Sequence, residues 1–223
     1  MPDIPKKIHL IYKIPDIPED YQDYYKIIKE LHPFWDIKVY GDEEARGIIA
    51  RHLPELLDIY DSYELDVQRT DIFRIAVTYI FGGFYMDLDM MILKSLDPLC
   101  NCQLVLGEEK TMSDMECNAV GIKHNLRIAN YMFGAIPGHP FWTDVIKEAI
   151  SRCGIKIKKE GDVLETTGPG LLTDVYHDTK EKYKDITILF NKDKMCRKWC
   201  NKFSCHFGEY AAHFHHGKWR WEN

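Results

Sequence analysis

Apolar and polar positions follow each other along this chain with periods that predict strands and helices in turn. Short runs rich in β-branched and aromatic residues predict strands over residues 6–14, 35–41, 84–96, 102–109 and 185–190. Apolar residues at helical spacing predict helices over residues 19–33, 43–60 (one or two, with Pro54 starting the second), 66–81, 124–151 (with a break at Pro137–Pro140) and the later part of 166–179. This alternation predicts an α/β fold, a single domain over residues 1–223 with a mostly parallel central sheet flanked by helices.

One stretch joins a helix to a pair of carboxylates. The segment 66–81 is apolar almost all round, so the helix is expected to be buried on several sides, and Gly82-Gly83 ends it. In the strand after these glycines, Asp87 and Asp89 would point to the same side while Leu88 turns back into the packing. Two carboxylates held so close repel each other, and a divalent cation such as Mg²⁺ or Mn²⁺ would remove the conflict. The alternative is a solvent-exposed strand end, because a D-x-D pattern also arises by chance.

A second charged pair lies within the same apolar helix. Asp71 and Arg74 are three residues apart and so share one face. They could form an internal ion pair that fastens the helix. They could instead face the strand end, where they would hydrogen-bond a polyhydroxylated ligand and balance phosphate charge. The pattern alone leaves both interpretations open.

Composition and charge narrow the class of protein. The 223 residues are 45% hydrophobic, enough for one domain with a sizeable core, and the net charge of −6 argues against a general nucleic-acid binder. No apolar run reaches the ~18 residues of a membrane span. The odd count of seven cysteines predicts free thiols in a reducing, cytoplasmic compartment.

A cluster near the C-terminus raises the question of structural zinc. It consists of Cys196, Cys200, Cys205 and His206. The cysteines are spaced more widely than in a C-x2-C knuckle, so free thiols are the favoured interpretation and zinc the alternative.

Several segments, in a fixed order, carry a resemblance to a known family. They read "IPKKIHLIYKIP", "RTDIFRIAVTYIFGGFYMDLDMMILKSLDPL", "TTGPGLL" and "HHGKWRW". In this combination the chain resembles the glycosyltransferases of family 32, which have a DXD sugar-binding region and include initiating α-1,6-mannosyltransferases and bacterial capsular-sugar transferases. It is more distantly similar to the glucosylating domain of large clostridial toxins.

The resemblance implies a GT-A fold, in which one Rossmann-like domain binds a nucleotide-sugar donor and Mn²⁺ or Mg²⁺. Asp89 would be a direct metal ligand, and Asp87 would lie near the metal, the ribose and the donor sugar. By the same analogy Asp71 and Arg74 contact the transferred sugar, which favours the functional interpretation of that pair. The implied donor-binding residues are Leu10, Ile11, Tyr12, Asp71, Arg74, Asp87, Leu88, Gly168, Lys218 and Trp221.

Two of these donor contacts rest on weaker patterns. Tyr12 is a possible stacking partner of the nucleobase, where the family often has a tryptophan. The segment 167–170, "TGPG", offers backbone N–H groups at a predicted helix start, which suits an anion or a sugar but equally an ordinary turn with an N-cap.

The histidine-rich tail offers a third metal ligand in two registers. Related enzymes close the site with a His-His segment followed by a tryptophan. Aligning on Trp221 makes His216 the ligand, whereas aligning on Trp219 puts Phe214 there, which cannot ligate. His216 is therefore the preferred ligand, with His213 and His215 as second choices, and Lys218 could meet a phosphate or be solvated.

The predicted activity is transfer of a hexose from UDP-glucose, UDP-galactose or GDP-mannose to a hydroxyl acceptor. The acceptor would be a glycan, a lipid-linked oligosaccharide or a glycoprotein, and a bacterial or viral setting is favoured because no membrane anchor is evident. No nucleophile or general base stands out, and the resemblance implies retention of configuration without a covalent enzyme intermediate. Nucleotidyl transfer and a non-catalytic nucleotide-sugar-binding module are the alternatives. His139, Phe141 and Trp142 would line the acceptor side or, as the favoured interpretation, pack in the core.

Overall fold

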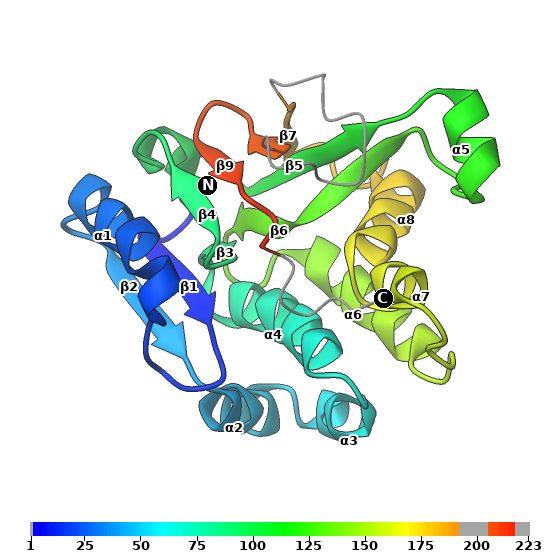
Figure 1. Ribbon diagram of the computed structural model, residues 1–223, viewed down its shortest axis with the longest axis horizontal. Coiled ribbons are helices and arrows are strands. Elements are labelled where there is room, and N and C mark those ends of the chain that lie inside the picture. The colour runs from blue at the N-terminus through cyan, green and yellow to red at the C-terminus, as the bar shows by residue number, and fades with distance from the viewer. Residues whose placement is uncertain (1, 192–204, 217–223) are drawn as a thin grey trace.

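The computed structural model describes residues 2–191 and 205–216 (Figure 1). A six-stranded sheet with the order β2-β1-β3-β6-β5-β7 forms its centre. The strands are β1 (Lys7–Ile11), β2 (Asp36–Tyr40), β3 (Gly83–Met86), β5 (Leu104–Thr111), β6 (Leu126–Ala135) and β7 (Ile186–Leu189). β1 is parallel to both β2 and β3, and β5 is parallel to β7, whereas β6 is antiparallel to β3 and β5. The sheet is mixed and mostly parallel, which confirms the predicted fold class.

A second, smaller sheet lies beside the first. It contains β4 (Met90–Ile92), β9 (Ala211–His213) and β8 (Cys205–Phe207), in that order and all antiparallel. β9 joins β4 directly after the D-x-D segment, with His213 opposite Met90. Strand β9 is thereby placed beside β4, the strand that directly follows the two aspartates (Figure 1).

Helices and 3-10 turns connect the strands and cover the main sheet. They are η1 (Glu19–Tyr21), α1 (Gln22–Leu31), α2 (Asp42–His52), α3 (Pro54–Ser62), α4 (Asp66–Phe81), η2 (Asp97–Asn101), α5 (Asp114–Val120), α6 (Pro140–Arg152), α7 (Glu160–Thr166) and α8 (Pro169–Thr179). The predicted helix over 66–81 and the second start at Pro54 are confirmed, while α5 and α7 were not predicted. No helix within the described residues is long and apolar enough to cross a membrane.

Side chains alternate along the central strands between two hydrophobic clusters, one on each face of the sheet. Phe84 and Met86 of β3 lie in the cluster that also holds residues of α1 and the small sheet. Tyr85 lies in the other cluster, with residues of α4, α6 and α8. Strands buried on both faces are expected in a layered α/β domain. Because β1 and β3 are parallel, their C-terminal ends meet at one edge, where ligands bind in such sheets.

The structure corrects two predictions about secondary structure. Residues 126–135 form the strand β6 and not the first half of a helix, because this segment pairs with β3 on one side and β5 on the other. Gly134 allows the close approach to β3, since a Cβ there would lie 2.4 Å from the ring of Phe84.

The second correction concerns the strand predicted over 84–96. β3 ends at Met86, and the chain turns before β4 begins at Met90. The N–H of Met90 donates to the carbonyl of Asp87 across this turn, at 3.2 Å. Asp87 and Asp89 therefore lie in a turn and are not alternate residues of a continuous strand.

Candidate functional site

The turn between α4 and β3 fixes where the two aspartates lie. Gly82 and Gly83 have φ values of 63° and 95°, which residues with a Cβ atom rarely adopt. The buried ring of His9 stabilises this turn, because its Nε2 lies 2.7 Å from the carbonyl oxygen of Gly82. Helix α4 and strand β3 are thus held side by side, with their polar residues at the same edge of the sheet.

Arg74 links the charged residues of α4 to the D-x-D turn. Its Nη2 lies 3.3 Å from carboxylate oxygens of both Asp71 and Asp87. Its Nη1 donates to the carbonyl of Asn130 in β6 at 2.7 Å, and the guanidinium lies 4.8 Å from the ring centre of Tyr85. The Arg74 side chain is only 7% exposed, so its charge depends on these two carboxylates for compensation.

Asp71 is the most enclosed carboxylate of the site. One oxygen accepts from the Thr167 hydroxyl at 2.8 Å, and the other accepts from the Asn130 amide at 3.1 Å. Burial raises the pKa of Asp71 to about 6, although Arg74 and Thr167 act in the opposite direction. The two interpretations of the Asp71 and Arg74 pair are therefore not exclusive: the residues form an ion pair, and that pair faces the D-x-D turn.

Asp87 and Asp89 differ in their surroundings. The Tyr85 hydroxyl donates to Asp87 at 2.6 Å, and burial raises the pKa of Asp87 despite the nearby Arg74. Asp89 lies 3.0 Å from Nε2 of His213, and its other oxygen accepts from the backbone N–H of His216 at 2.8 Å. Burial opposes ionisation of Asp89, but the hydrogen bond and charge of His213 outweigh it and hold the Asp89 pKa below its usual range.

The structure distinguishes among the three tail histidines that were considered as metal ligands. His213, at the end of β9, places Nε2 3.0 Å from Asp89 and 4.0 Å from Asp87. The ring of His216 instead stacks on Tyr21, with 5.5 Å between ring centres, and contacts Tyr24. His215 packs against His213. In this geometry His213, a second choice from the sequence, is the histidine beside the aspartates, and the preferred His216 faces α1.

The donor atoms of the site are suited to binding a divalent cation. Single ligand atoms of Asp87, Asp89 and His213 all lie within 4.8 Å of one another. Two carboxylates and one imidazole are a suitable set for Mn²⁺ or Mg²⁺. In addition, Nε of the buried Arg74 has no hydrogen-bond partner within the described part of the chain, which leaves a donor available to a ligand at the same place.

The other predicted donor residues are placed less directly. Leu10 and Ile11 point into the two hydrophobic clusters, so only the backbone could reach a nucleobase there. Tyr12 comes directly after the end of β1 and is half-buried, at the same edge of the sheet as Asp87. Gly168 is the N-cap of α8, next to the Thr167 that binds Asp71, while Leu88 packs against the core.

Some predicted residues lie outside the described ranges or in the core. Lys218, Trp221, Trp219, Cys196 and Cys200 fall in the segments that are not described. Cys205 is a buried cysteine in β8. The favoured interpretation of the acceptor-side group is confirmed, because His139, Phe141 and Trp142 are each at most 1% exposed.

Sequence reasoning missed three residues of the site. Asn130 was overlooked because its segment was taken for a helix, and Tyr85 because an apolar strand gives no reason to single out one aromatic residue. Thr167 was noted only as part of a small-residue loop. In the structure all three hydrogen-bond or contact the Asp71, Arg74 and Asp87 group.

Comparison with known proteins bears on this arrangement directly. Residues 18–106 match the family described as "Glycosyltransferase sugar-binding region containing DXD motif". This part of the chain is therefore similar to a DXD sugar-binding region. It contains Asp71, Arg74, Asp87 and Asp89, and the resemblance inferred from the sequence is thereby confirmed.

The chain is also similar to fungal mannosyltransferases. "Inositol phosphoceramide mannosyltransferase 3" of Schizosaccharomyces pombe is 32% identical over 144 residues, which are 65% of this chain and 36% of that protein. "Initiation-specific alpha-1,6-mannosyltransferase" of the same yeast is 25% identical over 194 residues, or 79% of this chain and 48% of that protein. The chain thus spans less than half the length of these two relatives.

Among solved structures, the PaToxG glycosyltransferase is similar over 82% of this chain and 72% of its own, with a TM-score of 0.58 and 17% sequence identity. At that identity the likeness concerns the fold alone. It supports the GT-A-like fold that was predicted together with the DXD sugar-binding region.

Proposed function

We propose that this protein is a metal-dependent glycosyltransferase that moves a hexose from a nucleoside diphosphate sugar to a hydroxyl acceptor, with residues 1–223 acting as one catalytic domain. The observation that carries the proposal is the convergence of Asp87, Asp89 and His213, linked through Arg74 to Asp71. Apart from His213, these residues belong to the matched sugar-binding region, and they lie at the edge of the sheet where ligands bind in this class of fold.

The sugar that we propose is mannose. Both relatives described above are named as mannosyltransferases, and the matched region contains Asp71 and Arg74, which the proposal places against the transferred sugar. Tyr12 offers a flat surface on which the guanine of a GDP-sugar or the uracil of a UDP-sugar would stack.

Asp87, Asp89 and His213 would hold the divalent cation, which we propose to be Mn²⁺ or Mg²⁺. When bound, such a cation neutralises charge that builds up on the leaving diphosphate. Within the protein, Arg74 supplies a fixed positive charge beside the same turn, with its free Nε available to a donor oxygen. Asp71, held by Thr167 and Asn130, orients Arg74, and the lone pairs that remain on its oxygens would accept hydrogen bonds from sugar hydroxyls.

We further propose that configuration is retained without a covalent enzyme intermediate. Both oxygens of Asp71 already accept hydrogen bonds, from Asn130 and Thr167, so this carboxylate is poorly placed to act as a nucleophile. Asp87 is engaged by Arg74 and Tyr85. The acceptor hydroxyl would then attack the anomeric carbon from the side that the diphosphate leaves. The bond from that carbon to the diphosphate oxygen breaks, and the hydroxyl proton passes to the leaving diphosphate. A glycan, a lipid-linked oligosaccharide or a glycoprotein could supply that hydroxyl.

Donor hydrolysis provides the test, because it requires no acceptor. GDP-mannose, UDP-glucose and UDP-galactose are incubated with the protein in Mn²⁺ or in EDTA, and the released nucleotide is measured by mass spectrometry. We expect metal-dependent release from one donor, and a loss of at least about 100-fold in Asp89→Ala. The matched control is Asp58→Ala, which alters an exposed aspartate of α3.

Two outcomes would contradict the proposal. If Asp89→Ala kept the turnover and the Mn²⁺ affinity of the wild type, the proposed metal site would be wrong. Binding of nucleotide sugars by the wild-type protein with no turnover of any donor would favour the non-catalytic module instead.

A further inference from the structure

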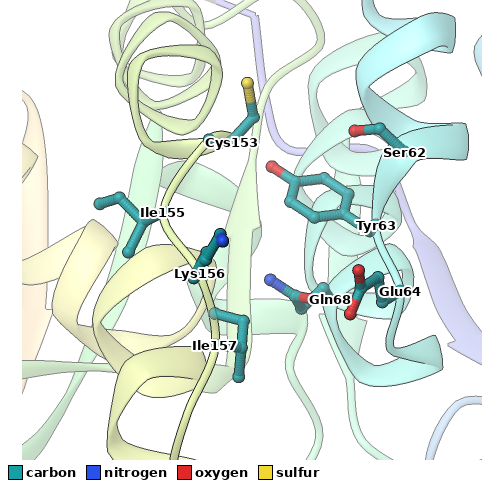
Figure 2. A pocket seen from close by; sticks show the side chains of 9 residues that line it. Ser62, Tyr63, Glu64, Gln68, Cys153, Ile155, Lys156 and Ile157 are labelled. Atoms are coloured by element: carbon teal, nitrogen blue, oxygen red, sulfur yellow. The ribbon is translucent and has the colours of Figure 1, made fainter.

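A pocket of about 390 Å³ lies apart from the D-x-D turn, between the segment that joins α3 to α4 and the loop after α6 (Figure 2). The first wall includes Tyr63 and Gln68, and the second includes Cys153, Lys156 and Ile157. None of these residues belongs to the metal and donor group described above. Pockets of this size are in the range that holds small ligands in proteins.

The floor of the pocket contains a polar group that the protein leaves unused. Tyr63 is 5% exposed, and its hydroxyl has no hydrogen-bond partner among the described residues. Figure 2 shows this hydroxyl pointing across the pocket toward the Cys153 side. A buried hydroxyl without a partner costs free energy, and a ligand that hydrogen-bonds it would recover that cost.

Helix α4 connects the pocket to the candidate metal and donor site. Gln68, which is 4% exposed, lies three residues before Asp71, so the two side chains are on one face of the helix. Burial raises the pKa of Tyr63, so its hydroxyl stays protonated and can donate a hydrogen bond. Gln68, which lines the pocket, is thus less than one turn of α4 away from the carboxylate that the proposed donor site uses.

The mouth of the pocket mixes hydrogen-bond donors and acceptors with apolar surface. Ser62, Glu64 and Lys156 are exposed there and supply a hydroxyl, a carboxylate and an ammonium group. The ring of Tyr63 and the side chain of Ile157 give flat and aliphatic surfaces. Sugars present both kinds of surface, because their hydroxyl groups alternate with C–H faces that pack on aromatic rings.

We propose that this pocket binds the acceptor, and that the acceptor group it receives is a saccharide or a polyol of similar size. Tyr63 and Gln68 would bind hydroxyl groups of that ligand from the floor, and a neighbouring hydroxyl would be directed toward the side of the pocket where Asp71 lies. This assignment rests on the proposed glycosyltransferase function and extends it by naming the place and chemical class of the acceptor.

Binding of simple glycosides tests the pocket without any donor or metal. Methyl α-glycosides of mannose, glucose and galactose are titrated into the full chain, and saturation-transfer NMR gives dissociation constants. We expect saturable binding of at least one glycoside, weakened about five- to tenfold in Tyr63→Phe and in Gln68→Ala. Tyr25→Phe, which changes a half-buried tyrosine of α1, is the matched control and should bind as the wild type does.

Tyr63→Phe removes only a hydroxyl that has no partner within the described residues, so the fold should be retained, as circular dichroism would confirm. With an active donor, the ratio of sugar transferred to the glycoside over sugar lost to water should fall by a similar factor in this variant. Absence of binding for all three glycosides, or equal binding by wild type and both variants, would overturn the assignment. Failure of the wild type to hydrolyse any donor would count against the glycosyltransferase proposal alone, since the binding measurement is independent of turnover.

Discussion

The guanidinium of Arg74 lies 3.3 Å from the carboxylate of Asp87, and this contact joins a buried helix to the turn at the end of β3. The same nitrogen lies 3.3 Å from Asp71. One cation therefore compensates two carboxylates in a region where charge is costly to bury. Stability and the arrangement of the candidate site depend on the same three side chains.

Replacing Arg74 should destabilise the protein strongly. Arg74→Met leaves Asp71 and Asp87 without their shared cation, and we expect a loss of about 3 kcal/mol or more in the free energy of unfolding, measured with urea. The double variant Asp71→Asn/Arg74→Met should recover part of that loss, because one uncompensated charge is removed. Arg46→Met is the control: it breaks the exposed pair with Asp61, which should cost at most about 1 kcal/mol. If both variants lost the same free energy of unfolding, the buried ion pairs of Arg74 would contribute no more to stability than the exposed pair of Arg46.

The tail histidines should differ in their effect on metal binding. His213→Ala removes an imidazole that lies 3.0 Å from Asp89, so we expect Mn²⁺ affinity to fall by at least about tenfold, measured by electron paramagnetic resonance. His216→Ala keeps the backbone N–H that binds Asp89, and its ring faces Tyr21, so its effect should be clearly smaller. The reverse order of effects would favour the register first preferred from the sequence.

The buried His9 should make stability dependent on pH. Burial lowers the pKa of His9 from 6.5 to about 4, so the folded protein keeps the ring neutral where the unfolded chain already binds a proton. Above pH 6.5 the His9 ring is neutral in both the folded and the unfolded state, and it does not reduce stability. As the pH falls from 6.5 toward 4, the unfolded chain binds a proton at His9 that the folded protein does not bind, and the free energy of unfolding decreases. The free energy of unfolding should therefore decrease by about 3 kcal/mol from pH 7 to pH 4 through His9 alone.

Chemical denaturation at several pH values would measure this effect. In His9→Gln the decrease between pH 7 and pH 4 should be smaller by that amount, whereas His52→Gln, at an exposed position in α2, should keep it. An unchanged pH profile in His9→Gln would mean that other groups dominate acid unfolding.

Two glycines should respond in opposite directions to alanine. A Cβ at Gly134 would lie 2.4 Å from the Phe84 ring, in the centre of the sheet, so Gly134→Ala should cost about 1–3 kcal/mol of stability. Gly47 lies in α2 with no atom within 4 Å of a Cβ, and Gly47→Ala should stabilise the helix by about 0.5–1 kcal/mol. Thermal unfolding of both variants gives the comparison. A stable Gly134→Ala protein would show that β3 and β6 can move apart without loss.

Local patterns were enough to predict α4 and the glycine turn at its end. The helix is apolar on almost every side, and its end is marked by two adjacent glycines, so neither its type nor its C-terminal boundary depended on distant residues. The aspartates were singled out for the same reason, since charge directly after a buried segment requires compensation.

The strand β6 could not be recognised in this way. It is buried on both faces, and a strand of that kind has the continuous apolar character of a buried helix. The misassignment also concealed Asn130, whose amide reaches Asp71 only because β6 lies in the middle of the sheet. Similarly, the choice of His213 over His216 depends on the pairing of β9 with β4, between residues separated by more than a hundred positions.

That pairing also sets the order in which the site can form during synthesis. A ribosome that has released the chain only through β6 has already delivered both aspartates and Arg74, while the imidazole of His213 is still to be made. A nascent chain at this stage would hold two negative charges with no nitrogen ligand between them. High metal affinity would therefore arrive only once β9 has been made, so cation uptake would report the pairing of β9 with β4 more than the folding of the earlier strands.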